Sequence, residues 1–234
     1  MKKLFLFTTC LFAAVIMNAQ PLEEIVKNFT IANKYDQLKD KKTIKITAKM
    51  SMQGMEMPME IWMKNPNKIK TVLQVQGQEV IQVFDGEKGY SVNPMLTGSA
   101  TPVEMSPEEV KRTLRNNTFE NTLENDLKGG RLTLLGEDAV NGKPVYKVKV
   151  AIDEETASNI FIDKTTWLLV KQIIDFTQGG TPMNSETYPS EYTETSGVIM
   201  PRKITTLISG MEMVITFTNV EVDVPVEDSI FKLK

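Results

Sequence analysis

The chain has 234 residues, of which 41% are hydrophobic and 24% are charged, and its formal net charge is −3. It contains no histidine and a single cysteine, Cys10, which excludes Ser/His/Asp and Cys/His catalytic arrangements and leaves no set of thiolate or imidazole ligands for a metal. The acidic balance argues against a nucleic-acid partner, which would require a clearly basic domain, and we expect no cofactor.

Residues 1–19 are typical of a secretory signal peptide. Two lysines precede an apolar run, residues 4–17, and the segment ends at the small residue Ala19, which is the pattern that signal peptidases cleave. Because Cys10 lies inside the apolar run, the mature chain has no cysteine and no disulfide. We therefore expect an exported protein with a single domain over residues 20–234.

Residues 22–32 carry apolar side chains at helical spacing and predict an amphipathic helix. The next stretch, Thr43–Lys64, predicts a β-hairpin, because apolar and polar residues alternate on both arms and Gln53-Gly54 can form a two-residue turn. Such a turn sets Met52 opposite Met55. The apolar face of the hairpin is rich in methionine. It carries Met50, Met52, Met55, Met57, Met59, Ile61 and Met63.

The methionine-rich face is open to two interpretations. Methionine is unbranched and polarizable, so it fills irregular gaps in a core, and it also lines surfaces that adapt to changeable apolar ligands. A later segment repeats the pattern, since Gly54-Met55-Glu56-Met57 recurs as Gly210-Met211-Glu212-Met213 after another predicted turn. The repeat favours a methionine-lined surface with a function and adds Met211 and Met213 to its candidate residues.

Lysine is concentrated in the first part of the mature chain. Residues 21–75 hold ten lysines and six acidic residues, whereas residues 76–234 hold 15 basic and 24 acidic residues. Several of the lysines, including Lys45 and Lys49, fall on the hairpin face opposite the methionines. They form either an ordinary solvated sheet face or a surface that meets an anionic membrane or an acidic partner.

Further strands continue the hairpin. Residues 69–75 predict a third strand whose apolar side chains extend the same face, because a turn at residues 65–67 pairs Met63 with Ile69 and Met59 with Leu73. Two short strands follow, at residues 80–84 and 90–92.

A helical insert separates two β-rich halves. Residues 93–102 are rich in Gly, Ser, Thr and Pro and predict a loop. Residues 106–109 then provide an N-cap serine, a proline in the first turn and a capping-box glutamate, and the helix that they begin is expected to end near Leu114. A second helical segment is expected before Lys128-Gly129-Gly130, which can terminate it.

The second half returns to β structure. Asn141-Gly142 is a hairpin signal, and alternating segments lie on both sides of it. Pro189 and Pro201 predict strand edges or bulges rather than central ladder positions, and the terminal Ile230-Phe231 is expected to dock on the sheet. In total we expect about eleven strands, the later ones at residues 132–135, 145–152, 159–162, 167–176, 186–193, 199–208 and 211–222.

Carboxylates are the remaining catalytic candidates. Glu186, Glu191 and Glu194 lie close in sequence to Tyr188 and Tyr192, and a carboxylate pair for glycoside hydrolysis is chemically conceivable. Their spacing does not distinguish such a site from a solvated strand face. We therefore predict a binding protein rather than an enzyme, with no catalytic residue.

Four segments follow the signal peptide, the helix and the long hairpin in a recognisable order. They are Val83-Phe84-Asp85-Gly86-Glu87-Lys88-Gly89-Tyr90-Ser91-Val92-Asn93-Pro94, Gly142-Lys143-Pro144-Val145-Tyr146, Ile162-Asp163-Lys164-Thr165 and Asp228-Ser229-Ile230-Phe231. Together they resemble the outer-membrane lipoprotein-sorting, or LolA-like, family over nearly the whole mature chain. The resemblance implies a mainly β protein with a few helices (α+β), in which a single curved antiparallel sheet forms an incomplete β-barrel and helices cover its concave mouth.

The resemblance also implies a function and a site. It implies a periplasmic carrier that shelters acyl chains of a lipoprotein or another lipid during transport towards the outer membrane, with transient contact to envelope membrane proteins and no stable oligomer. Each buried methylene would contribute about 0.8 kcal/mol. The implied lipid-binding cavity is lined by Met50, Met52, Met55, Met57, Met59, Ile61, Met63, Leu73, Met211 and Met213.

One feature departs from the family pattern. In the family an arginine on an early strand takes part in the carrier's function, whereas the first arginine of this chain is Arg112, after the first group of strands. Lysine is not equivalent to arginine, so the early lysines cannot be assumed to take its place. The departure leaves open a different lipid cargo, or an envelope sensor or regulatory module that uses the same fold to bind a partner protein.

Overall fold

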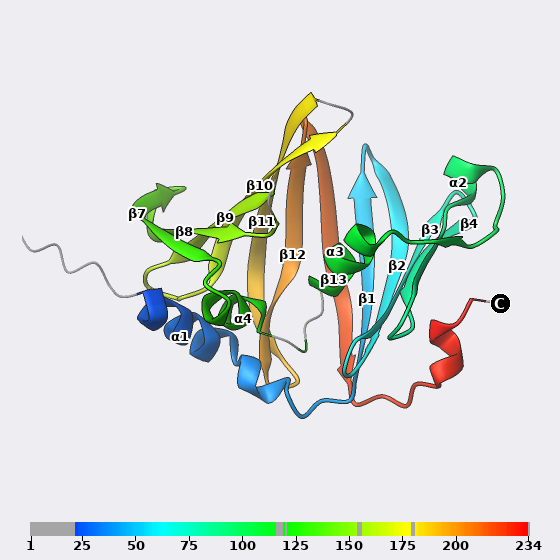
Figure 1. The fold of residues 1–234 in the computed structure, drawn as a ribbon, viewed down its shortest axis with the longest axis horizontal. Coiled ribbons are helices and arrows are strands. Elements are labelled where there is room, and N and C mark those ends of the chain that lie inside the picture. The colour runs from blue at the N-terminus through cyan, green and yellow to red at the C-terminus, as the bar shows by residue number, and fades with distance from the viewer. Residues whose placement is uncertain (1–21, 116–118, 120, 154–155, 179–180, 234) are drawn as a thin grey trace, which may run out of the picture.

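One antiparallel sheet dominates the molecule. The computed structural model describes residues 22–115, 119, 121–153, 156–178 and 181–233, so the predicted signal peptide lies outside the described residues. Thirteen strands form the sheet in the order β6-β5-β4-β3-β2-β1-β13-β12-β11-β10-β9-β8-β7 (Figure 1). The sheet curves without closing into a barrel, as expected for a half-barrel with few helices.

The strands form two meanders that meet at the centre of the sheet. Consecutive strands pair with each other from β1 to β6 and from β7 to β13, and antiparallel pairing of β1 with β13 joins the two halves. In chain order the strands are β1 Thr43–Met52, β2 Met55–Lys64, β3 Lys68–Val75, β4 Gln78–Phe84, β5 Gly89–Val92, β6 Val103–Glu104, β7 Leu132–Val140, β8 Lys143–Ala151, β9 Ala157–Asp163, β10 Leu169–Gln178, β11 Thr181–Thr195, β12 Val198–Ile208 and β13 Met211–Val222.

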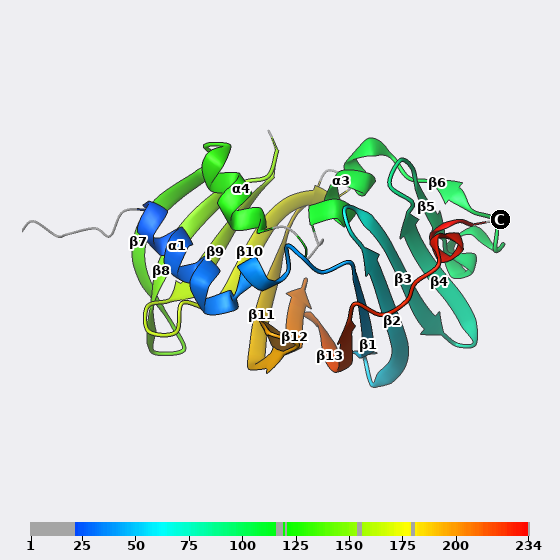
Figure 2. The same cartoon turned by 90° about the horizontal axis from the view of Figure 1, so that it is seen from below.

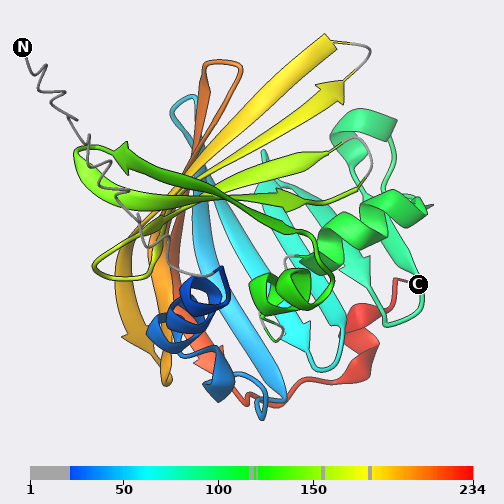
Figure 3. The same ribbon diagram turned by 60° about the vertical axis from the view of Figure 1, so that its left-hand side comes forward.

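Two helices cover the inner face of the β7–β10 half. One buried cluster joins these helices to strands β8 and β9. It contains Ile25, Val26 and Phe29 of α1, Leu123 of α4 and Ile160 of β9. In Figure 3 these helices lie within the curve of the sheet. The helical segments are α1 Leu22–Asn33, η1 Tyr35–Gln37, α2 Pro94–Thr97, α3 Pro107–Arg115, α4 Thr122–Lys128 and η2 Asp228–Phe231.

A second core fills the base of the other half. Buried Leu38, Ile44 and Phe217 form part of a cluster against which Val110 and Leu114 of α3 pack. Tyr35 of η1 packs against both this cluster and the α1 cluster. Seen from below in Figure 2, α1 and α4 lie over one half of the sheet and α3 over the other.

Local signals account for the helix ends. Ser106 and Glu109 form the predicted capping box, because the Ser106 N–H donates to Glu109 Oε2 at 2.8 Å and the Glu109 N–H donates to Ser106 Oγ at 3.3 Å.

A buried carboxylate links the two helices. Asp126 in α4 accepts from Arg115 at 3.0 Å and from Arg131 at 2.8 Å. These two ion pairs tie α3 and α4 to the start of β7.

The sheet has more strands than the sequence predicted. The additional short strand β6 follows a segment that composition assigned entirely to a loop, and the same segment contains helix α2. Asn93 caps α2 by accepting from the Leu96 N–H, and Gly98 ends it at φ 71. The loop prediction was therefore wrong for residues 94–97, where capping groups stabilise one helical turn.

Pro189 and Pro201, the two prolines expected at strand edges or bulges, lie where a ladder ends. Pro189 in β11 pairs with β12 but lies two residues beyond the last pair that joins β11 to β10, at Thr187. Pro201 in β12 pairs with β11 but lies two residues before the first pair that joins β12 to β13, at Lys203. Each proline is thus paired on one side only, which suits a residue that has no N–H to donate.

Candidate functional site

All ten candidate lipid-binding residues lie on one face of the sheet. Directly paired residues of neighbouring strands share a face, and Met52 pairs with Met55 on one side and with Met213 on the other. Met50 pairs in the same way with Met57, as the predicted turn requires. We call this set the methionine face; it comprises Met50, Met52, Met55, Met57, Met59, Ile61, Met63, Leu73, Met211 and Met213.

The methionine face belongs to the inner, helix-covered side of the sheet. Met63 is part of the cluster against which α3 packs, and Met59 and Ile61 pack against the same cluster. Met59 also pairs with Leu73 of β3, as predicted. The base of the hairpin is therefore core in the ordinary sense.

Exposure changes along the hairpin from its base to its tip. Met63 is only 3% exposed, whereas Met55 is 41% exposed and Met211 is 48% exposed. Met57 is an exception near the tip, at 5% exposed. The remaining members, Met50, Met52, Met59, Ile61, Leu73 and Met213, are half-buried. The methionine face is thus a filled core at the hairpin base and an accessible apolar surface at the hairpin tips. We call this accessible end, around Met52, Met55 and Met211, the lip.

The lip is built from two neighbouring hairpin tips. The β1–β2 turn and the β12–β13 turn lie at the same end of the sheet (Figure 1), where the Gln53 amide nitrogen lies 3.6 Å from the Met211 sulfur. Both turns use a non-glycine residue followed by glycine at positive φ, with Gly54 at 79° and Gly210 at 81°. The repeated Gly-Met-Glu-Met sequence therefore places its two copies at the same end of the sheet, on β2 and β13, which flank β1 on either side.

Lysines on the outer face are largely neutralised within the chain. Lys49 pairs with Glu56 at 3.4 Å, and Lys45 lies 3.7 Å from Glu60 and 4.4 Å from the centre of the Trp62 ring. Two further lysines of this face bind one carboxylate at the carboxyl-terminal end of the chain. These ion pairs favour the solvated-face interpretation over an anionic membrane contact.

The carboxyl-terminal segment docks on the outer face, as predicted for Ile230-Phe231. Phe231 is fully buried, and Asp228 accepts from Lys64 at 2.5 Å and from Lys68 at 2.8 Å. These hydrogen bonds lower the pKa of Asp228 to about 2. The segment is therefore fixed by both an apolar anchor and a double ion pair.

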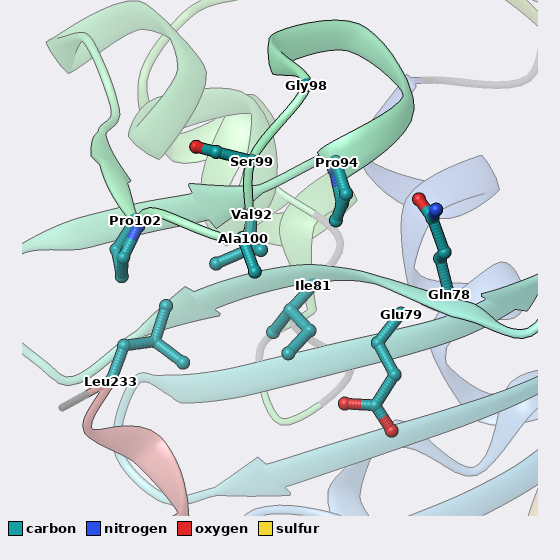
Figure 4. Close-up of a pocket in the computed structure, with 10 residues that line it drawn as sticks. All are labelled: Gln78, Glu79, Ile81, Val92, Pro94, Gly98, Ser99, Ala100, Pro102 and Leu233. Carbon is teal, nitrogen blue, oxygen red and sulfur yellow. The ribbon is translucent and has the colours of Figure 1, made fainter.

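Two open hollows flank this segment on the outer face, which the sequence did not predict. One, of about 530 Å³, lies between β4, the loop after α2 and Leu233. Figure 4 shows the Leu233 side chain directed toward Ile81 of β4, with Pro102 on the loop beside it. The other, of about 470 Å³, lies beside Trp62 and Ile230. Both combine non-periodic loop or terminal residues with a sheet face, so no spacing in the sequence indicates them.

Two of the three carboxylates considered for catalysis, Glu186 and Glu194, are engaged in ion pairs. Glu186 accepts from the Tyr188 hydroxyl and from Lys171 at 2.9 Å, and these contacts lower the pKa of Glu186. Glu194 pairs instead with Lys34 at 2.6 Å. A catalytic general acid needs a raised pKa, whereas the pKa of Glu186 is lowered. Glu186 is therefore suited to be an ionised partner of Lys171 rather than a proton donor.

Two further features concern the described part of the chain. Among its residues, no three acidic side chains gather closely enough to hold a metal ion. None of its helices has the length and apolar character to cross a membrane.

Comparison with known proteins identifies the fold. A LolA superfamily protein from Nitrosomonas europaea superposes with a TM-score of 0.60 at 11% identity, over 91% of this chain and 97% of that one. The chain has the LolA-like fold. A domain described as outer-membrane lipoprotein-sorting, from Vibrio parahaemolyticus, superposes with a TM-score of 0.56 at 12% identity, over 88% of this chain and 97% of that one.

A third protein shares the LolA-like fold. It is a DUF1329 family protein from Desulfovibrio piger, with a TM-score of 0.57 at 14% identity, over 89% of this chain and 97% of that one. At the level of sequence, no protein-family model matches the chain and no curated protein matches it. The likeness therefore establishes the architecture that the sequence resemblance predicted, and the function has to be argued from the site.

Proposed function

We propose that this protein is an exported, periplasmic carrier that shelters acyl chains of a lipoprotein or another lipid against the methionine face. The observation that carries the proposal is the lip, where Met55 and Met211 are 41% and 48% exposed beside a group of half-buried methionines. Covering apolar surface of this kind with hydrocarbon is favourable, and each methylene removed from water contributes about 0.8 kcal/mol to binding. Flexible methionines can follow chains of different shape.

The carrier acts by binding and has no catalytic residue. Acyl chains enter at the lip, where the side chains are accessible, and the filled base limits how far they penetrate. The Asp126 ion pairs with Arg115 and Arg131 hold α3 and α4 in place over the inner face. No arginine lies on β1 to β5, which supports a cargo held by apolar contact rather than by an arginine on an early strand.

The test is lipid binding by the intact mature protein and by two charge-insertion variants. Met213→Glu places a carboxylate on the methionine face, whereas Thr216→Glu places one on the outer face of the same strand, between its cross-strand partners Lys49 and Lys203. Displacement of N-phenyl-1-naphthylamine by palmitate derivatives measures affinity. We expect Met213→Glu to weaken binding about tenfold or more and Thr216→Glu to leave it unchanged.

Native mass spectrometry with lipid extraction provides the independent readout. Protein purified from the cell envelope should carry extractable acyl lipid. The carrier proposal is abandoned if no lipid copurifies and the wild-type protein also fails to bind fatty-acid and lipopeptide probes.

A second candidate function is an envelope sensor or regulatory module that binds a partner protein. The two outer-face hollows beside the carboxyl-terminal segment favour it, because a partner could insert side chains at Ile81 and Trp62. Photo-crosslinking from position 79, between the two hollows, tests this candidate. A specific protein adduct in the envelope, together with absent lipid binding, would replace the carrier proposal.

A further inference from the structure

A row of neutral polar residues continues the methionine face across the sheet. The direct cross-strand partners, from β9 to β2, are Ile160, Gln172, Thr187, Thr206, Met213, Met52 and Met55. Because paired residues share a face, this single row runs from the α1-covered core to the lip. Its middle, Gln172-Thr187-Thr206, is polar, and none of its seven members is charged.

Buried partners hold the polar middle of the row. Thr206 is 7% exposed, and its hydroxyl lies 3.3 Å from the Thr187 hydroxyl. Ser158, which is 1% exposed, accepts from the Gln172 Nε2 at 2.9 Å. Thr187 and Gln172 themselves are half-buried. The arrangement leaves the second Gln172 N–H and the Gln172 carbonyl oxygen with no partner among the described residues, on side chains that water or a ligand can reach.

The charged side chains next to Gln172 and Thr187 lie on the opposite side of the sheet. Lys171 and Glu186 are next to Gln172 and Thr187 along their strands, so strand alternation directs them to the outer face, where they bind each other at 2.9 Å. A ligand carboxylate that displaces water from Gln172 would therefore not meet the Lys171 ammonium in exchange, which is unfavourable. A neutral carbonyl, in contrast, can accept from the amide or hydroxyl.

We propose that Gln172 and Thr187 form a subsite for the carbonyl of an ester- or amide-linked acyl chain, whose hydrocarbon then lies along Met213, Met52 and Met55. This inference rests on the proposed carrier function and specifies its cargo class as a neutral acyl conjugate rather than a free fatty acid or plain hydrocarbon. Neighbouring strands are about 4.8 Å apart, so Met213 lies about 10 Å and Met52 about 14 Å across the sheet from Thr187. A long acyl chain that runs from the carbonyl past Thr206 can therefore reach the methionines.

The experiment compares three probes on wild-type protein and on variants of the row. The probes are 1-monopalmitoylglycerol with an ester, palmitamide with an amide, and hexadecane with neither, each measured by displacement of N-phenyl-1-naphthylamine. Thr187→Val/Thr206→Val removes both hydroxyls together, so neither is left unpaired. Gln172→Met is the second variant, and Thr205→Val, on the outer face of β12, is the control.

We expect each row variant to bind the ester and amide probes about five- to tenfold more weakly, because a net hydrogen bond of about 1 kcal/mol is lost. Hexadecane binding should stay within about twofold, and Thr205→Val should match wild type. Weakening for one linkage only would identify the glycerolipid or the amide-linked source.

Two results overturn the inference in distinguishable ways. Wild-type protein that binds all three probes, with row variants that lose none of them selectively, refutes the subsite and leaves the carrier proposal standing. Wild-type protein that binds none of the probes refutes the carrier proposal and the subsite with it. Should the double valine variant fail to fold, Gln172→Met alone gives the same comparison.

Discussion

Truncation of two methionines on one face should separate its structural end from its binding end. Met63 is 3% exposed within the core at the hairpin base, so Met63→Ala should lower the free energy of unfolding by about 2–5 kcal/mol through lost burial and a residual cavity. For a chain of this size, 3 kcal/mol corresponds to a fall in Tm of about 6–12 °C. Affinity for acyl probes should change by less than about twofold once the variant is folded.

Met52→Ala should behave in the opposite way. Met52 is half-buried at the lip, where water already reaches it, so its truncation should lower the free energy of unfolding by less than about 1.5 kcal/mol. Bound hydrocarbon would lose contact with about two methylene-sized groups, which at about 0.8 kcal/mol each corresponds to about tenfold in affinity.

Urea unfolding followed by circular dichroism, together with dye displacement on the same samples, measures both quantities. The division into base and lip is refuted if Met52→Ala destabilises the protein as much as Met63→Ala does and leaves acyl binding intact. In that case the whole methionine face would be core.

Three predictions concern the elements around the site. Phe231→Ala should lower the free energy of unfolding by about 3–5 kcal/mol, because the side chain is fully buried; an unchanged urea midpoint would contradict its role as an anchor. The pKa of Asp228 falls from 3.8 to about 2 through its lysine partners, so its stabilisation is complete above about pH 4 and is lost as the pH falls through 2. Asp228→Asn should therefore flatten the change in Tm between pH 4 and pH 2, and an identical change in wild type and variant would refute this. Asp126→Asn, at a side chain 3% exposed, should lower the free energy of unfolding in urea by about 1–3 kcal/mol. Asp36→Asn, which removes an exposed pair with Lys39, should change it by less than about 0.5 kcal/mol. Equal effects of the two variants would show that the buried carboxylate has no special role.

Local register was predictable because every signal for it lies within a few residues. Alternation over Thr43–Lys64 and the glycine at position 54 specify both the hairpin and its pairing, and the observed pairs Met52–Met55 and Met59–Leu73 agree. Short elements were harder. Helix α2 has an N-cap at Asn93 and a left-handed Gly98, but composition rich in loop residues concealed them.

Long-range pairing was not predictable from periodicity. The contact of Met52 with Met213 joins residues about 160 positions apart, and alternation within a strand carries no information about its distant neighbour. The repeated Gly-Met-Glu-Met sequence was the one local sign. Exposure was equally hidden, because Met63 and Met55 occupy the same place in the sequence pattern. Met63 is core because Leu38, Phe119 and α3 pack in the cluster over the hairpin base.

The filled base and the accessible lip depend on each other through strand register. A slip of one residue would turn every side chain of the hairpin to the other face, so the buried contacts at Ile44 and Met63 fix the direction in which Met52 and Met55 point. Tight packing at the base keeps the backbone rigid, and adaptation to a ligand then falls to the rotamers of unbranched side chains. A surface built in this way should tolerate variation in acyl-chain length more readily than insertion of one residue between Met52 and the base of the hairpin, which would direct the lip methionines into the outer face.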